Sequence, residues 1–406
     1  MIDIFYFGSV INDDRFNDNV KNGKRKPSSS AQVFEMNILK GLRNTEKCNL
    51  TVCSAESIAV FPGSKKLFIR FRNDFLFDDV CTSVLPSINL PFIKSSIFAY
   101  FLKKRFKVWA KNGAKNKVLL TYGQYTHPTN VLLKLCQKYD IKCIDILADS
   151  PSIALSEEDH TFFSYFKGLN RKFNEKLQSR FDYYVILTEH FKEFINGKKS
   201  IVLECICDEN EFLTSSNKEH KKNVVFYAGT LNKKYGIDNI CKVFMIDENK
   251  DLQLWIAGSG DYETEIIKIA QYDSRIKFLG RLNREDILKL EQECSLLINL
   301  RNPNEYFTRF SFPSKMVEYM ASGTPVLTTK LPGIPDEYFD YVFTVDQLTP
   351  IMIFERIKEI LTIDSNELVR FGEHARNFVI KNKNYHKQGH KLVCFMEEIL
   401  SEDNNN

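Results

Sequence analysis

The sequence has no hydrophobic run long enough to cross a membrane. None of its segments approaches the roughly 18 consecutive apolar residues that a transmembrane helix requires. The profile of a signal peptide is also missing, because Met1 leads directly into a strand-like segment at residues 2–7. We therefore expect a cytoplasmic protein that at most touches the inner face of the cell membrane.

Cysteine pairs that would indicate a zinc site are missing as well. The ten cysteines are scattered, none forms a CxxC pair, and Cys205-x-Cys207 alone is not a zinc pattern. An excess of one charge is also missing: 56 Lys and Arg against 52 Asp and Glu leave a net charge of +4, too small to imply nucleic-acid binding by itself. We expect free thiols, no metal site and no nucleic-acid partner.

What the sequence does contain is an alternation of strand and helix patterns, over a length that accommodates two domains. This alternation predicts an α/β protein with parallel, doubly wound sheets. The expected organisation is a first domain at residues 1–207, a polar linker at 208–222, a second domain at 223–385, and a C-terminal helix with a tail at 386–406. Gly8-Ser9-Val10 follows the first strand in place of a GxGxxG turn, so a nicotinamide-binding enzyme fits poorly.

One stretch, residues 310–327 (FSFPSKMVEYMASGTPVL), combines the features of an anion site. We expect a helix with Ser314 as its N-cap and Gly323 at its end, since these residue types are preferred there. Free N–H groups and the helix dipole at such a start attract phosphates. Glu318 lies one turn further among apolar residues, where a carboxylate could accept from the two hydroxyls of a ribose. An ordinary exposed glutamate is the alternative.

This stretch resembles the donor-site motif of retaining GT-B glycosyltransferases, in particular those of family 4. Glu318 and the turn Gly323-Thr324-Pro325-Val326 match the second half of the motif, whereas Phe310 occupies the place of its first glutamate. The preceding Phe-Ser-Phe-Pro-Ser-Lys is similar to a subgroup that assembles bacterial capsules and other surface polysaccharides. The resemblance implies two Rossmann-like domains that face each other across a cleft, with the last helix crossing back to the first domain.

The resemblance also implies a donor site on the loops after the strands of the second domain, where ligands of open α/β sheets bind. Glu318 would bind ribose, and the helix start at Ser314 would bind the diphosphate of a UDP- or GDP-sugar. The donor-binding candidates are Gly229, Thr230, Lys234, Gly258, Ser259, Gly260, Arg281, Leu282, Arg301, Ser314, Lys315 and Glu318.

Two of these positions depart from the family pattern. Thr230 stands where the family has an arginine, and Tyr235 stands at the register of a lysine, one residue after Lys234. For Lys234, Arg301 and Lys315 the alternative is a solvated surface residue, and for the glycines it is a tight strand-to-helix turn. Glu305 is a candidate to replace the missing glutamate, with a solvated loop glutamate as the alternative.

In the first domain, His127, Asp149 and Glu189 are candidate catalytic residues at or near strand ends. A histidine there could hydrogen-bond a sugar hydroxyl. The alternatives are a loop histidine before Pro128 and, for Glu189, a first-turn residue that serves the helix dipole. We expect a mobile loop at residues 12–30, which the resemblance places over the acceptor.

Residues 92–117 carry many basic residues and aromatic residues but no acidic one. A basic amphipathic helix with Phe and Trp on its other face indicates peripheral membrane binding. The alternative is a surface helix whose aromatic face belongs to the core and whose lysines are solvated.

The resemblance implies retaining, metal-independent transfer of a sugar without a cofactor, from a nucleotide sugar to an oligosaccharide or polyprenyl-diphosphate-linked acceptor. Positioning and neutralisation of charge would do most of the work. Two alternatives stay open: a catalytically silent GT-B partner of an active transferase, which Phe310 and Thr230 would suit, and a GT-B nucleotide-sugar epimerase.

Overall fold

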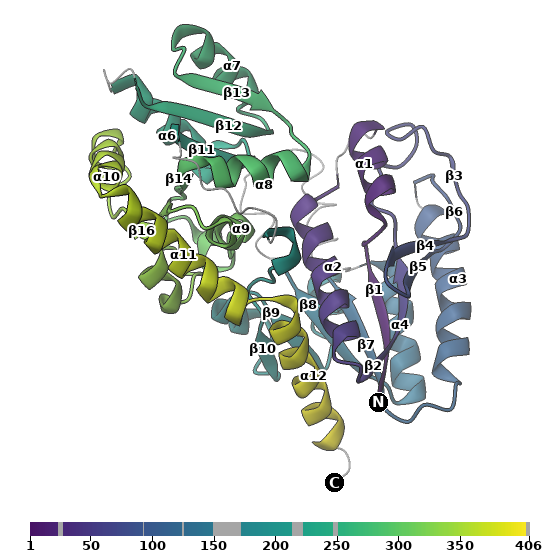
Figure 1. Ribbon diagram of the computed structural model, residues 1–406. Helices are drawn as coiled ribbons and strands as arrows, with labels where there is room; N and C mark the ends of the chain where they lie inside the picture. The colour runs from purple at the N-terminus through teal and green to yellow at the C-terminus, as the bar shows by residue number, and fades with distance from the viewer. Residues whose placement is uncertain are drawn as a thin grey trace. The chain divides into compact units, whose positions relative to one another are not determined.

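The computed structural model describes residues 1–22, 27–91, 93–123, 126–148, 172–212, 222–246 and 251–402. The chain forms two compact units, one made of residues 1–204 together with 385–406 and the other of residues 205–384. Both are built from strands and helices in alternation, as the sequence predicted (Figure 1). Of the expected linker, residues 213–221 lie outside the described part of the chain, and a short 3-10 helix, η2 (Glu209–Phe212), precedes them.

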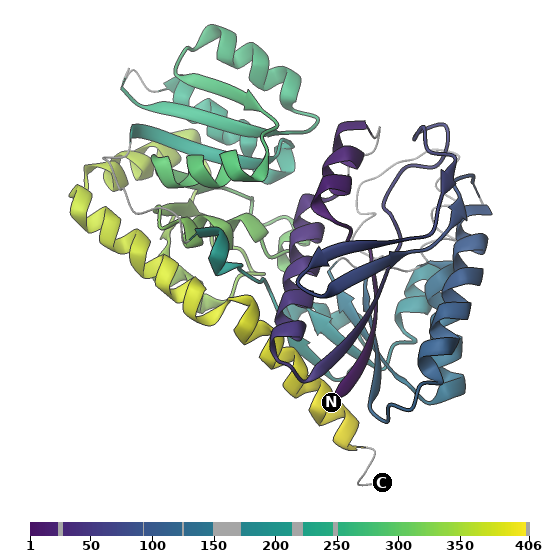
Figure 2. The ribbon, with the colours of Figure 1, turned by 45° about the vertical axis from the view of Figure 1, so that its right-hand side comes forward.

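The first unit contains an eight-stranded sheet with the order β10-β9-β8-β7-β1-β2-β5-β4. Its strands are β1 (Ile2–Gly8), β2 (Cys48–Ser54), β4 (Arg72–Phe77), β5 (Val80–Val84), β7 (Lys117–Tyr122), β8 (Lys142–Leu147), β9 (Tyr183–Ile186) and β10 (Ser200–Val202). Neighbours are parallel except β4 and β5, an antiparallel hairpin at one edge (Figure 2). Strands β3 (Phe68–Ile69) and β6 (Ser87–Ile88) form a separate antiparallel pair.

Helices α1 (Asp13–Asn22), α2 (Ser29–Asn44), α3 (Ile93–Ala110), α4 (His127–Tyr139), α12 (Tyr385–Ser401) and the 3-10 helix η1 (Glu189–Phe194) complete the described part of the first unit. Helix α12 lies against α2 (Figure 1). The two backbones approach so closely that a Cβ on Gly389 would lie 2.3 Å from the carbonyl carbon of Gly41. Only glycine at both positions allows this contact.

Helix α1 corrects the expectation of a loop at residues 12–30. The segment is polar, but its charges suit a helix, with Asp13 and Asp14 in the first turn and Lys21 in the last. The Asn12 side chain accepts a hydrogen bond from the Arg15 N–H at 3.2 Å. Residues 23–26 lie outside the described part of the chain.

Helix α3 shows where the aromatic residues of the basic segment lie. Phe98, Phe106 and Trp109 are buried, and the Phe106 ring packs edge-on against Phe5 of β1 at 5.0 Å. The aromatic face therefore belongs to the core, which is the alternative that the sequence left open. Lys103, Lys104 and Arg105 lie on the exposed side, and Phe92 lies outside the described residues. Among the described residues, no helix has both the length and the apolar character to span a membrane.

The second unit contains a parallel six-stranded sheet with the order β13-β12-β11-β14-β15-β16. Its strands are β11 (Lys222–Thr230), β12 (Gln253–Ser259), β13 (Ile276–Gly280), β14 (Cys294–Asn299), β15 (Val326–Thr328) and β16 (Phe343–Thr344). Its helices are α6 (Ile237–Ile246), α7 (Glu263–Tyr272), α8 (Arg284–Glu293), α9 (Ser314–Ser322), α10 (Pro350–Thr362) and α11 (Ser365–Asn382), with 3-10 turns η3 (Lys233–Tyr235), η4 (Tyr306–Arg309) and η5 (Asp336–Tyr341).

Each face of this sheet has its own hydrophobic core. Phe226 of β11 packs in the core formed with α8, α9 and α11, whereas Val225 packs in the core formed with α6, α7 and α10. Successive side chains of a strand point to opposite faces, so a strand covered on both sides reads as a continuous apolar run. This layering places the loops after the strands, and the start of α9, at the carboxyl edge of the sheet.

Candidate donor site in the second unit

Helix α9 begins one residue earlier than the sequence predicted. Pro313 is the N-cap residue and Ser314 is the first helical residue, so the prediction that Ser314 caps the helix is wrong. Pro313 has an extended backbone (φ −70°, ψ 101°) and no side-chain group that could cap. The N-cap residue therefore leaves the first N–H groups of α9 without a side-chain partner, as an anion site needs. At the other end Gly323 adopts the left-handed conformation, with φ of 75°.

Glu318 is the centre of a network of charged side chains. Its carboxylate accepts a hydrogen bond from Arg284 Nη1 at 2.8 Å and one from the Lys315 ammonium. Arg284, at the start of α8, also donates to both oxygens of Glu211, at 2.7 and 2.5 Å. Lys315 contacts a second acid, Glu291 of α8, at 3.2 Å. Glu318 is thus held in one position by two cations.

The two acids of this network have opposite pKa shifts. Burial alone would raise the pKa of Glu318, but the charges of Lys315 and Arg284 hold it well below its usual range. Glu291 is fully buried, and burial together with the charge of Glu318 raises its pKa well above the ordinary value. Its Oε2 atom makes no hydrogen bond with the described residues. Glu318 is therefore the member of the pair that favours the ionised form, and Glu291 the member that holds its proton more strongly.

A third cation, Arg301, lies two residues after β14 without a carboxylate partner among the described residues. Arg301 Nη1 donates to the Ser311 hydroxyl at 3.0 Å, and its guanidinium lies 4.6 Å from the centre of the Tyr235 ring. Its Nε is buried and makes no hydrogen bond with any described residue. Burial lowers the pKa of Arg301, but a guanidinium remains charged. A charged group in this setting favours an anionic ligand.

The glycines that follow β11 and β12 are required by close backbone packing. This fits the alternative given above for these positions, a tight strand-to-helix turn. A Cβ on Gly258 would lie 1.9 Å from the Gly229 carbonyl oxygen, and one on Gly260 would lie 2.3 Å from the Leu231 carbonyl oxygen. The turns after β11 and β12 therefore pack backbone against backbone. The same packing brings Thr230 and Ser259, which are paired across the two strands, to the carboxyl edge.

The remaining donor-binding candidates occupy more exposed positions. Lys234 lies in η3, with its ammonium 5.4 Å from the centre of the Tyr235 ring. Arg281 is exposed and Leu282 half-buried in the turn after β13. Lys234 and Arg281 therefore lie close to the surface of this edge.

Phe310 stands at the position of the first glutamate of the family motif, and Glu305 is the nearby candidate to replace that glutamate. Phe310 is buried, and its ring packs against Tyr306 at 5.1 Å. Glu305 is the exposed N-cap residue of η4, and its backbone oxygen accepts from the Thr308 hydroxyl at 2.6 Å. A buried aromatic side chain thus stands where the family motif has a carboxylate.

The candidate catalytic residues of the first unit are less distinctive. His127 is exposed at the start of α4. The side chain of Glu189 is 66% exposed and pairs with Lys192, one turn later, at 2.6 Å, which is the pattern of a first-turn residue. Asp149 lies outside the described residues.

Sequence reasoning missed Arg284, Glu211 and Glu291. A signal existed for two of them. Arg284 stands in the first turn of a helix, where the dipole disfavours a cation unless it has an acidic partner. Glu291 falls on the same helix face as Leu288, which is the buried face of α8.

Comparison with known proteins agrees with this architecture. Residues 208–378 match the family model described as Glycosyl transferases group 1. Among solved structures, the chain is similar to sucrose-phosphate synthase from Thermosynechococcus elongatus, with a TM-score of 0.68, 13% identity and coverage of 98% of this chain and 100% of that one. HepE from Anabaena in complex with UDP and glucose has a TM-score of 0.65 at 14% identity, with 98% and 100% coverage.

The lipopolysaccharide outer core galactosyltransferase WaaB in its apo form has a TM-score of 0.57 at 13% identity, with 97% and 99% coverage. A search of curated proteins found no match. The chain therefore has the GT-B fold, and its residues 208–378 match the group 1 glycosyl transferases, which together support a glycosyltransferase.

Proposed function

We propose that the chain is a retaining, family 4-type glycosyltransferase that moves a sugar from a UDP- or GDP-sugar to a surface polysaccharide or a lipid-linked oligosaccharide. The observation that carries this proposal is the ionised Glu318, held by Arg284 and Lys315 beside the uncapped start of α9. Each carboxylate oxygen has more than one lone-pair direction, so one donor on each leaves acceptor capacity for the two ribose hydroxyls.

In this proposal Arg301 replaces the arginine that Thr230 lacks. Its guanidinium stacks on Tyr235, the residue at the lysine register of the motif, and binds Ser311, the neighbour of Phe310. The start of α9 and Arg301 together would bind the diphosphate and stabilise the charge that develops on it as the glycosidic bond breaks. The reaction would then need positioning and charge stabilisation from the protein, without a resident metal or cofactor.

The acceptor would bind the first unit, where His127, Glu189 and Asp149 are the proposed polar groups. An acceptor on a polyprenyl diphosphate would bring the enzyme to the inner face of the cell membrane. Because Phe98, Phe106 and Trp109 of α3 are buried, we propose that its contact with lipid is mainly electrostatic, through the exposed Lys103, Lys104 and Arg105. Binding to anionic but not to neutral vesicles tests this point.

The donor site is tested by titrating the full chain with UDP, GDP and ADP in a calorimeter. UDP is the first choice, because UDP is present in the HepE complexes. Replacing Glu318 by Gln should weaken the binding of the preferred nucleotide by about tenfold or more, since a hydrogen bond to a charged group is lost. Glu355→Gln, an exposed change on α10, is the matched control. Equal affinities for all three proteins would contradict the assignment of Glu318.

Turnover separates the transferase from its main alternative. Phe310 in place of a glutamate and Thr230 in place of an arginine also suit a catalytically silent partner subunit. Release of free sugar from the preferred UDP- or GDP-sugar, with retention at the anomeric carbon seen by NMR, is expected of the enzyme. Nucleotide binding without any release, with or without acceptor, would favour the silent subunit.

A further inference from the structure

The first unit contains a small hollow that none of the proposed roles uses. It has a volume of about 290 Å³ and is lined by Arg15, Glu56, Lys66, Phe68, Ile69, Arg70 and Arg72. Arg15 comes from α1, Glu56 follows β2, and Arg72 pairs with Val84, the last residue of β5. The hollow thus lies at the carboxyl edge of the sheet, the edge at which α/β proteins bind ligands.

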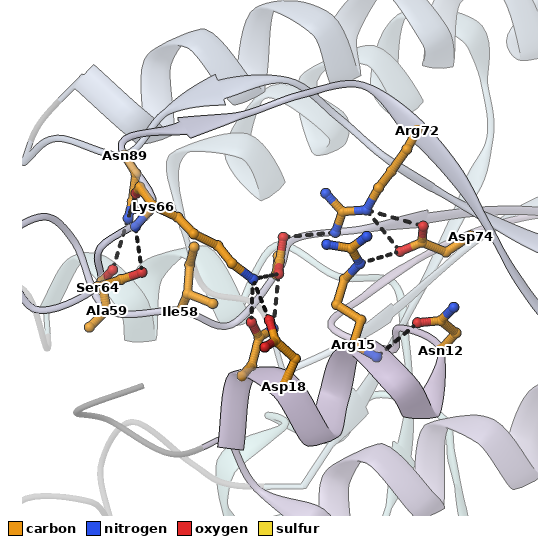
Figure 3. Close-up of polar contacts among 12 residues, drawn as sticks. Asn12, Arg15, Asp18, Ile58, Ala59, Ser64, Lys66, Arg72, Asp74 and Asn89 are labelled. Carbon is orange, nitrogen blue, oxygen red and sulfur yellow. Dashed lines mark hydrogen bonds and ion pairs between the residues drawn. The ribbon is translucent and has the colours of Figure 1, made fainter. Parts of the chain in front are cut away.

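The acids around this hollow are already neutralised by neighbouring side chains. Glu56 is buried and accepts from Arg72 Nη2 at 2.8 Å and from Asn19 at 2.9 Å, with the Lys66 ammonium 3.7 Å away. Asp74, also buried, accepts from Arg72 Nε at 2.9 Å and pairs with Arg15 Nε at 3.1 Å. Figure 3 shows the two guanidinium groups converging on Asp74. These acids hold the cations in place.

The cations outnumber the acids. Lys66 also pairs with Asp18, so Arg15, Lys66, Arg70 and Arg72 stand against three carboxylates. Lys94, whose ammonium donates to the carbonyl oxygen of Ile58, two residues after Glu56, at 3.0 Å, adds a second surplus positive charge. Arg70 is exposed and has no ion pair with the described residues, and the Arg15 guanidinium makes no side-chain hydrogen bond with them beyond its ion pair with Asp74.

We propose that this hollow binds a phosphoryl group carried by the acceptor saccharide, an inference that rests on the proposed transferase function. A phosphate monoester carries a charge of about −1.5 to −2 at neutral pH, which matches the surplus better than a single carboxylate does. Arginine forks suit phosphate oxygens. The Phe68 side chain, 65% exposed, supplies an apolar wall for the sugar ring or for the start of a lipid chain.

The size of the hollow limits the ligand. About 290 Å³ lies at the lower end of the volumes of small-molecule sites. It accommodates one phosphorylated sugar, so the rest of a longer acceptor would extend into solvent. The phosphoryl group could come from a sugar phosphate within a polysaccharide or from the phosphate of a lipid carrier, and both have the same chemistry at this site.

The test uses the full chain saturated with UDP, so that the donor site is occupied. Glucose 1-phosphate, glucuronate and glucose are titrated as probes, and dodecyl phosphate in neutral detergent micelles represents the lipid source. We expect glucose 1-phosphate to bind more tightly than glucuronate and glucose. Arg70→Ala and Arg15→Gln should each weaken its binding about tenfold, whereas Lys134→Ala, an exposed change on α4, should not.

UDP affinity is the control for folding and for the donor site. An unchanged UDP affinity in the Arg70→Ala protein shows that the second unit is intact, so a loss of phosphate binding then arises in the first unit, which contains the hollow. If dodecyl phosphate binds in an Arg70-dependent manner and glucose 1-phosphate does not, the site takes a lipid phosphate, and the proposal stands. Equal phosphate affinity in wild type, Arg70→Ala and Arg15→Gln, or tighter binding of glucuronate, overturns it. Absence of UDP binding would instead contradict the proposed transferase.

Discussion

Glu318 owes its charge to its neighbours, so its proposed role in nucleotide binding depends on them at the scale of single residues. Replacing Lys315 by Met removes the cation that lies between Glu318 and Glu291. The pKa of Glu318, now held well below its usual range, should then rise, because the charge of Arg284 would be left as the main effect opposing burial. Nucleotide affinity in the variant should fall as the pH is lowered from 7 to 5, whereas wild type should change little.

The measurement is a calorimetric titration with the preferred nucleotide at several pH values. Lys330→Met, at an exposed position of the second unit, is the control for the loss of a lysine. A pH profile of Lys315→Met that is parallel to that of wild type would show that Lys315 does not keep Glu318 ionised.

The proposed role of Arg301 predicts different effects on the binding of UDP, which carries the diphosphate, and of uridine, which does not. If Arg301 binds phosphate, Arg301→Met should weaken UDP binding by about tenfold or more and leave uridine binding nearly unchanged. Arg370→Met, an exposed arginine of α11, should change neither. A variant that loses uridine and UDP to the same extent would indicate that Arg301 supports the Tyr235 and Ser311 loops and does not contact phosphate.

At the scale of whole elements, the contact between α2 and α12 is the most sensitive to side-chain size. Gly389→Val would place a side chain where the Gly41 backbone lies, so the helices would have to separate. We expect a loss of roughly 1–3 kcal/mol in the free energy of unfolding, the usual cost of overpacking. Denaturant unfolding measures it, with Lys387→Ala, on the same helix but not in the glycine contact, as the control. No loss in Gly389→Val would mean that the helices are not packed this closely.

The individual strands and helices also show how much of the secondary structure could be predicted from the sequence. Strands such as β1 were predictable because all seven residues are buried and apolar residues dominate. Helix α1 was missed because Phe16 and Val20 are its only apolar residues, and β4 (RNDFLF) because an edge strand can be polar. The start of α9 was misplaced by one residue because Ser and Pro both suit helix starts.

The residues of the candidate site also fall into two groups, those that the sequence could identify and those that it could not. Glu318, Lys315 and Arg301 could be selected from the sequence because they belong to one motif or to the loop just before it. Arg284 could not be paired with Glu318 in advance, since 34 residues and two elements separate them and only the packing of α8 on α9 brings them together. Periodicity reports which face of a helix is buried, but it does not report which helix packs there.

At the scale of the whole molecule, we expect the stability of the first unit to depend on pH through the Glu56 carboxylate. Its pKa is lowered, because Arg72, Asn19 and Lys66 together outweigh the effect of burial. A carboxylate of this kind contributes stability that is fully present above its ordinary pKa of about 4.5 and is lost as the pH falls through the lower folded-state value. Glu56→Gln should therefore destabilise the protein at pH 7 by roughly 1–3 kcal/mol, and by less near pH 3.

Hydrogen exchange followed by mass spectrometry locates this effect. At pH 7, peptides from β2, β4 and β5 should exchange faster in Glu56→Gln than in wild type, whereas peptides from β11 and β12 serve as the internal reference. Glu46→Gln, an exposed change in the same unit, is the matched variant. Faster exchange confined to the second unit, or none at all, would contradict a stabilising role for Glu56.

The discontinuity of the first unit has a consequence for synthesis on the ribosome. The second unit is one continuous segment, residues 205–384, and can fold as soon as it has emerged. The first unit begins to emerge earlier, but it cannot complete its fold until residues 385–401 have also emerged. These residues form α12, which packs on α2 with Gly389 in contact with Gly41. Nascent chains stalled before that point should therefore show proteolysis in α2, and chains stalled well beyond it should be protected. The part of the protein that is made first would be the last to be finished.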